Sequence, residues 1–226
     1  DQRAKMYQEY TRMLRMFRPT MFIFENVTGL LSMKNDEGQP VIQDISVLFR
    51  NINDDLGYRL STQVLNAKNF GVPQSRDRVF IVGIRNDVDY QWEFPTATHG
   101  NKIKPYLTVE DAVSDLPVLN YGQTVEDYFE EPKTEYQRLM RGNQNFLHDH
   151  FCGTYGEKIT AVIHAVPQGE GRPFINNLIE NGELDERFYL TSGYRNTYGR
   201  LWWDRPSTTI TNSLGTPSAL RCIHPL

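Results

Sequence analysis

The sequence predicts an α/β fold, because apolar residues recur at helical spacing in two stretches and form short runs or alternations in three others. The expected order is a helix over 3–18, a strand over 21–27, a helix over 41–52, and strands over 58–67 and 78–86. Helices that alternate with strands in this way are typical of α/β domains. The last two strands have no helix between them, which predicts an antiparallel pair at the edge of the sheet.

Each of the first elements has its own signal. The first helix has apolar residues on one face and stops at Pro19, with the apolar positions at Met6, Tyr10, Met13, Leu14 and Phe17. The next segment, MFIFENV, begins with four apolar residues, which is the pattern of a buried parallel strand, and it carries Glu25 and Asn26 at its carboxyl end. The second helix stops at a turn that contains Gly57, and its apolar positions are Val41, Ile45, Val47, Leu48 and Ile52.

The composition of the sequence changes near residues 91–96, where prolines and glycines become frequent. We therefore expect two domains, over 1–93 and 94–226. The second is expected to be loop-rich and irregular with short strands, and with helices only near 108–115 and 134–141.

Composition describes an ordinary globular protein, with 226 residues, 39% hydrophobic and 23% charged. No apolar run approaches the roughly 20 residues that cross a bilayer, so we expect no membrane span. The two cysteines, Cys152 and Cys222, lack metal-ligand spacing and are expected to be reduced thiols of an intracellular protein. The pair His148 and His150 has no further ligands at suitable spacing, so no metal site is expected.

The net charge of −4 counts mildly against nucleic-acid binding, but its distribution is uneven. Acidic residues gather between 108 and 135. Between 187 and 205 the chain instead carries several arginines interleaved with tyrosines and tryptophans, namely Arg187, Arg195, Arg200 and Arg205. This basic, aromatic stretch is the candidate nucleic-acid surface.

Three segments place polar residues beside the predicted strands: PTMFIFENVTGLL (19–31), LNAKNFGVPQSRDRVFIVGIR (65–85) and YGRLWWDRPSTTIT (198–211). In order and spacing they resemble the DNA (cytosine-5) methyltransferase family. ENV is similar to the sixth motif of that family, QSRDR to the QxRxR of its eighth, and RLWWDRPSTTIT to the close of its target-recognition domain. DQRAKMY resembles the fifth motif, and RCIHPL resembles what precedes the ninth, so the resemblance covers essentially the whole chain.

The resemblance implies the C-terminal part of a Rossmann-like, S-adenosylmethionine-dependent methyltransferase sheet, followed by a smaller, irregular, β-rich target-recognition domain. The implied reaction adds a cysteine thiolate to C6 of a flipped cytosine, so that C5 can take the methyl group before the thiol is eliminated. Glu25 would relieve charge at N3, and its hydrophobic neighbours in sequence, Phe22 to Phe24, predict an apolar surrounding that favours the protonated acid. Arg78 would hold the cytosine O2, Arg76 would order the catalytic loop, and Asn66 would orient backbone in the active-site wall.

Three parts of the family's machinery are missing from these residues, one of which is the pair formed by the ninth and tenth motifs. There is no glycine-rich cofactor turn, and Met6 alone matches an apolar position that packs against the adenosine, although a role in core packing alone is an equal alternative. Neither cysteine follows a proline, so neither is predicted to be the nucleophile. We therefore expect part of a longer enzyme or one half of a split enzyme, with the remainder or a complementing chain as partner, and we expect the 226 residues alone to be inactive.

Double-stranded DNA is the expected partner of residues 96–221. By their chemistry, three arginines could contact guanine edges or phosphates and two threonines could donate to phosphates: Arg195, Arg200, Arg205, Thr209 and Thr211. The predicted function is that of a cytoplasmic, nucleoid-associated DNA cytosine-5 methyltransferase, either of a restriction-modification system or an orphan. The alternatives are a catalytically silent DNA-binding relative, a tRNA cytosine-5 methyltransferase, and an α/β interaction module without enzymatic ancestry.

Overall fold

A computed structural model describes residues 6–226 apart from 101, 192, 213–214 and 219. The chain divides into two compact units: the first consists of 1–66 and 77–97, and the second of 67–76 and 98–226. The segment 67–76, which joins two strands of the first unit, thus packs with the second. The assignment of 1–93 to catalysis and of 94–226 to target recognition stays a proposal.

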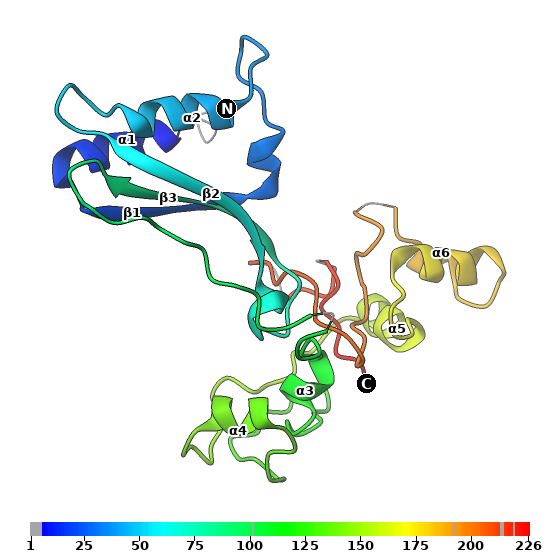
Figure 1. The fold of residues 1–226 in the computed structure, drawn as a ribbon. Coiled ribbons are helices and arrows are strands. Elements are labelled where there is room, and N and C mark those ends of the chain that lie inside the picture. The colour runs from blue at the N-terminus through cyan, green and yellow to red at the C-terminus, as the bar shows by residue number, and fades with distance from the viewer. Residues whose placement is uncertain (1–5, 101, 192, 213–214, 219) are drawn as a thin grey trace. The chain divides into compact units, whose positions relative to one another are not determined.

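The first unit is a three-stranded sheet with two helices on one face (Figure 1). The strand order is β1 (Met21–Val27), β3 (Asp77–Arg85), β2 (Tyr58–Asn66), and both pairs are antiparallel. The helices are α1 (Met6–Phe17) and α2 (Val41–Arg50), and a short 3-10 turn, η2 (Thr28–Leu31), follows β1. These elements confirm the five that the sequence predicts and the antiparallel edge pair.

The prediction of a parallel strand at 21–27 is wrong for the pairing that the structure describes, because β1 runs antiparallel to β3 along its whole length. The prediction took the run MFIF as burial on both faces of the strand. In the structure burial alternates along β1, with Phe22 and Phe24 buried and Ile23 and Glu25 exposed. One face of the strand therefore belongs to the core and the other carries the polar chemistry.

Aromatic rings fill the core between the sheet and its helices. Phe22 and Phe24 of β1 pack edge to face against Phe49 of α2, with ring centroids 5.1 and 5.4 Å apart. Tyr10 of α1 joins them, and its hydroxyl donates to the Ile23 carbonyl at 2.9 Å. A Cβ on Gly83, the residue opposite Phe22 on β3, would lie 2.1 Å from the Phe22 ring, so only glycine leaves that ring room on the sheet.

The second unit is built from short helices and irregular chain. Its helices are α3 (Val109–Val113), α4 (Glu135–Arg141), α5 (Glu157–Ala165) and α6 (Arg172–Glu180), with 3-10 turns η3 (Ala67–Phe70) and η4 (Glu186–Phe188). The two helices predicted near 108–115 and 134–141 are confirmed, and each begins with a capping box, at Thr108 and Thr134. The β-rich expectation is wrong for the described residues of this unit, which contain isolated bridges but no strand.

A separate small core holds α5 and α6 in place. Val162 and Val166 pack with Ile175 of α6, and Leu190 and Ile223 close the cluster from the following chain. The segment around 190 is therefore fixed beside α6. None of the helices in the described part of the chain is long and apolar enough to cross a bilayer.

Candidate active site and DNA-contacting segments

Glu25 and Arg78 form an ion pair on the face of the sheet opposite the helices. Glu25 lies opposite Phe80 on β3, and Arg78 is two residues away on the same face, so it reaches Glu25 diagonally. The Arg78 Nε lies 3.0 Å from Glu25 Oε1, and the exposed fractions of the two side chains are 17% and 45%. Arg78 Nη1 also donates to the Asp77 carbonyl at 2.7 Å, which fixes the guanidinium beside the carboxylate. The two residues predicted to act on the base are thus brought together.

The two phenylalanines that were expected to surround Glu25 lie on the other face of the strand. Because side chains alternate along a strand, Phe22 and Phe24 point into the core while Glu25 points away from it. The apolar residues on its own side of the sheet include Ile23 and Val27, which are each half exposed. Besides these residues, Phe80 lies directly opposite Glu25 on β3 and Arg78 holds the carboxylate as a cation, so the apolar surrounding of Glu25 stays a prediction.

Asn66 closes the end of β2 against β3. It is buried and pairs in register with Asp77, and its Nδ2 donates to the Asp77 side chain at 2.9 Å. This bond ties the strand end just before Arg78, so Asn66 lies where it can support the position of that arginine. Its predicted role in orienting the active-site wall stays a prediction.

Arg76 lies in the second unit, in a segment that is bonded to the TTIT sequence. The Ser75 amide donates to the Ser207 carbonyl at 2.8 Å, and the Ser207 amide donates to the Pro73 carbonyl at 2.9 Å. The Thr209 hydroxyl donates to the Ser75 carbonyl at 3.1 Å. Thr209 therefore uses its one hydroxyl donor within the protein, which corrects the prediction that it donates to a DNA phosphate.

Thr211 is half buried, and its predicted contact with phosphate stays a prediction.

Met6 is the first residue of α1, and the residue is 61% exposed. The alternative that Met6 only packs in the core of this unit is therefore wrong. The recess of about 610 Å³ in the first unit does not include Met6 and is lined by charged groups, among them Arg18, Asp55 and Arg85. Met6 is thus an exposed thioether that an adenosine could contact, and Met13 and Met16 of the same helix are exposed as well.

Arg200 is a structural residue, and the prediction that it contacts DNA is corrected. Only 8% of the residue is exposed. Its Nε donates to the Val166 carbonyl at 2.7 Å, and its Nη1 donates to the His224 carbonyl at 2.6 Å. Further bonds go to the carbonyls of Ile163 and Leu226. Burial lowers the pKa of the guanidinium from its ordinary value, yet an arginine stays charged at neutral pH. Four backbone carbonyls depend on this one side chain.

Arg200→Ala is expected to lower the free energy of unfolding by on the order of 3 kcal/mol, because four carbonyls, three of them only partly buried, lose their donor together. Arg200→Lys should restore little, since one ammonium lacks the planar fork that reaches them all. Urea unfolding measures the change. Arg205→Ala is the matched control, because Arg205 is exposed and pairs with its exposed neighbour Asp204, and solvent-exposed ion pairs contribute little to stability. Equal stability of the Arg200→Ala and Arg205→Ala proteins would contradict this assignment.

The other two predicted arginines remain at the surface. Arg205 lies over the Trp202 ring at 4.7 Å, and Arg221 lies over the same ring at 4.0 Å. Trp202 packs closely on Gly169, where a Cβ would come within 2.1 Å of the indole nitrogen. Arg195 is exposed and lines a recess beside α6. Sequence reasoning missed Arg221, because nothing in RCIHPL shows that its side chain returns to stack on a tryptophan nineteen positions earlier.

Comparison with known proteins now adds to this geometry. The family of C-5 cytosine-specific DNA methylases matches residues 1–210. The chain belongs to this family. It is 33% identical over 172 residues to the type II methyltransferase M.DdeI of Desulfomicrobium norvegicum, covering 75% of the chain and 40% of that protein. It is 31% identical over 275 residues to M.AgeI of Thalassovita gelatinovora, covering 93% of the chain and 62% of that protein.

A solved structure shares the fold. The crystal structure of a prophage-encoded DNA modification methyltransferase from Escherichia coli superposes with a TM-score of 0.62 at 16% identity, over 100% of the chain and 60% of that protein. The chain therefore spans between about two fifths and three fifths of the length of these three proteins.

Proposed function

We propose that this chain supplies the base-binding edge and the DNA-recognition part of a DNA cytosine-5 methyltransferase. The observation that carries the proposal is the Glu25–Arg78 pair, whose Nε–Oε1 distance is 3.0 Å on the open face of the sheet. A carboxyl group and a guanidinium fixed side by side match the polar edge of cytosine, which presents the exocyclic amine, N3 and O2 in a row. Family membership over residues 1–210 supports the same conclusion.

In this proposal each residue has a separate task. Glu25 accepts a hydrogen bond from the exocyclic amine and, as an acid, holds the proton at N3 when the ring gains a nucleophile at C6. Arg78 donates to O2, so charge that moves toward that oxygen meets a fixed cation. Asn66, through Asp77, keeps the strand ends in register beside Arg78. The target base must leave the duplex, because both faces of the ring have to be reached.

S-adenosylmethionine is the proposed methyl donor, and it supplies an electrophilic methyl group to C5. Met6 is the residue of this chain that we assign to its adenosine side, as an exposed apolar contact. The remaining contacts and the thiol nucleophile would come from other residues of the enzyme. Double-stranded DNA is the proposed substrate, in a restriction-modification system or as an orphan activity in the cytoplasm, close to the nucleoid. Arg76, Arg195, Arg205 and Thr211 are the proposed supporting and DNA-contacting residues.

Methyl transfer to duplex DNA tests the proposal. The methylation-competent enzyme that contains this chain, as one polypeptide or two, is incubated with labelled S-adenosylmethionine and a mixture of duplexes. The expected product on digestion to nucleosides is 5-methyldeoxycytidine. Labelled N4-methyldeoxycytidine or N6-methyldeoxyadenosine would contradict the mechanism, and transfer to tRNA in place of DNA would contradict the substrate.

A further inference from the structure

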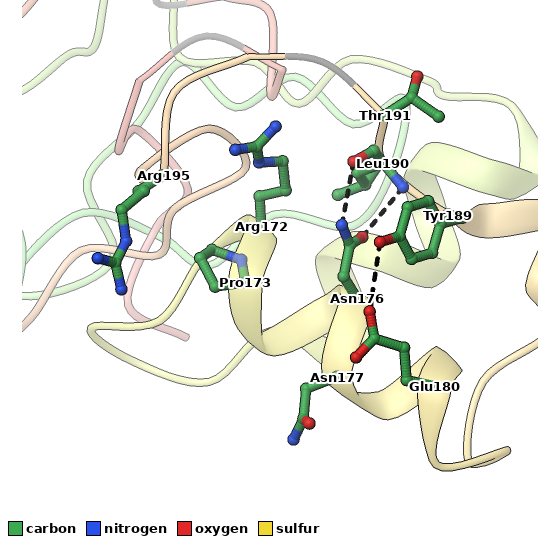
Figure 2. A pocket seen from close by; sticks show the side chains of 9 residues that line it. All are labelled: Arg172, Pro173, Asn176, Asn177, Glu180, Tyr189, Leu190, Thr191 and Arg195. Atoms are coloured by element: carbon green, nitrogen blue, oxygen red, sulfur yellow. Dashed lines mark hydrogen bonds between the residues drawn. The ribbon is translucent and has the colours of Figure 1, made fainter.

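A recess of about 470 Å³ lies beside α6 in the second unit, between that helix and the chain that follows η4 (Figure 2). One of its walls is fixed by a pair of hydrogen bonds. Asn176 Nδ2 donates to the Leu190 carbonyl and its Oδ1 accepts from the Leu190 amide, both at 3.0 Å. The amide group of Asn176 is thus engaged as donor and as acceptor with one residue, so it positions the wall.

Two arginines lie at one end of this recess, Arg172 on α6 and Arg195 on the following chain (Figure 2). Close backbone contact holds their segments together: the Arg172 amide donates to the Thr197 carbonyl at 2.9 Å, and a Cβ on Gly171 would lie 3.1 Å from the Arg195 carbonyl. No carboxylate pairs with either guanidinium among the residues that the structure describes. Two cations are thus held on one wall without a protein counter-ion.

The opposite end of the recess carries an acidic side chain instead of basic ones. Glu180 lies there and accepts a hydrogen bond from the Tyr189 hydroxyl at 3.2 Å. Figure 2 shows this acid bonded to Tyr189. An anion would therefore be favoured at the arginine end only, and the exposed amide of Asn177 is a further polar group on the lining.

We infer that the arginine end of this recess binds a phosphate of the DNA backbone, with Arg172 and Arg195 as its cationic contacts. The inference rests on the proposed function, because it takes DNA as the partner. Shape decides between phosphate and base: a side chain that reads base edges has to project into a groove, whereas a concave recess receives the convex phosphate backbone. Nothing in the sequence marks Arg172 for this role, because its closeness to Arg195 depends on the contact between residues 171–172 and 195–197.

The test compares Arg172→Ala, Arg195→Ala and the double variant in the methylation-competent enzyme, with Arg138→Ala on α4 as the control that removes the same charge elsewhere in the unit. Each is titrated against the duplex that the enzyme methylates and against a scrambled duplex, at several salt concentrations. We expect the Arg172→Ala protein to bind both duplexes about tenfold more weakly, and the double variant to have a salt slope shallower by about 0.9, the value for one phosphate. Arg172→Lys should restore most of the binding, because a phosphate accepts a point charge.

Three results would overturn the inference. Unchanged affinity and salt slope in the double variant would exclude the recess from the interface. A loss confined to the cognate duplex would make these arginines readers of a base. An equally large loss of affinity in the Arg138→Ala protein would show that the effect comes from net charge alone. If the unchanged enzyme failed to bind or methylate DNA, the proposed function itself would fail, and this would be seen before any variant is compared.

Discussion

Glu25→Gln is expected to slow methyl transfer in a single turnover by about 10²–10⁴-fold, the contribution usual for a positioned general acid. Glutamine keeps an oxygen that can accept from Arg78 or from the exocyclic amine of cytosine. It has no proton to give to N3 when the ring gains its nucleophile. Affinity for the duplex should stay within about threefold, because the ground-state contacts are mostly preserved. The variant should therefore bind the duplex almost normally while its rate of methyl transfer falls.

Glu9→Gln is the matched control, since Glu9 is also an exposed glutamate in the first unit, paired to Arg12 at 2.7 Å. It should leave the rate unchanged. Arg78→Ala provides the contrast: it should also slow turnover, with a larger effect on capture of the flipped base, which a fluorescent base analogue at the target position would report. Normal turnover in Glu25→Gln would make Glu25 structural and remove the central step of the proposed mechanism.

The pairing of Glu25 with Arg78 illustrates how far the sequence could lead. Both residues were predicted for the active site from their motifs, and the strands that carry them were placed correctly. Their contact depends on the register of β1 against β3, which joins residues more than fifty positions apart and has no local signal. The direction of β1 has no local signal either, so the apolar run MFIF alone favours the parallel arrangement that the structure does not have.

The second unit was harder to predict, for local reasons. α5 contains Ile159, Thr160, Val162 and Ile163, which are β-branched residues typical of strands, and α6 has two adjacent asparagines, which have low helix propensity. Their helical state depends on packing in the cluster around Val162 and Ile175. Local propensity alone could therefore not identify either helix.

Arg200 shows that the burial of a single side chain is hard to predict from the sequence. A sequence states that an arginine is charged but not where its side chain points, so four arginines among aromatic residues looked like one DNA-binding surface. In the structure Arg200 is buried among backbone carbonyls, while Arg195 and Arg205 stay exposed. Buried arginines of this kind are recognised only when the fold supplies several carbonyl acceptors at one point.

The 226-residue chain by itself is expected to transfer methyl groups at least about 10⁴-fold more slowly than the enzyme that contains it, because loss of a nucleophile usually costs several orders of magnitude. The physical reason lies in its thiols. Cys222 is half buried, and burial raises the pKa of its thiol, which disfavours the thiolate that would attack C6. Cys152 has no preceding proline, and its thiol donates to the Gly153 carbonyl at 3.6 Å.

The measurement is incorporation of labelled methyl groups into duplex DNA by the isolated chain. Circular dichroism establishes that the chain is folded, and the complete enzyme is the positive control. Efficient transfer by the folded chain would contradict the prediction, and its loss in Cys222→Ser or in Cys152→Ser would then identify the nucleophile that the sequence motifs do not reveal.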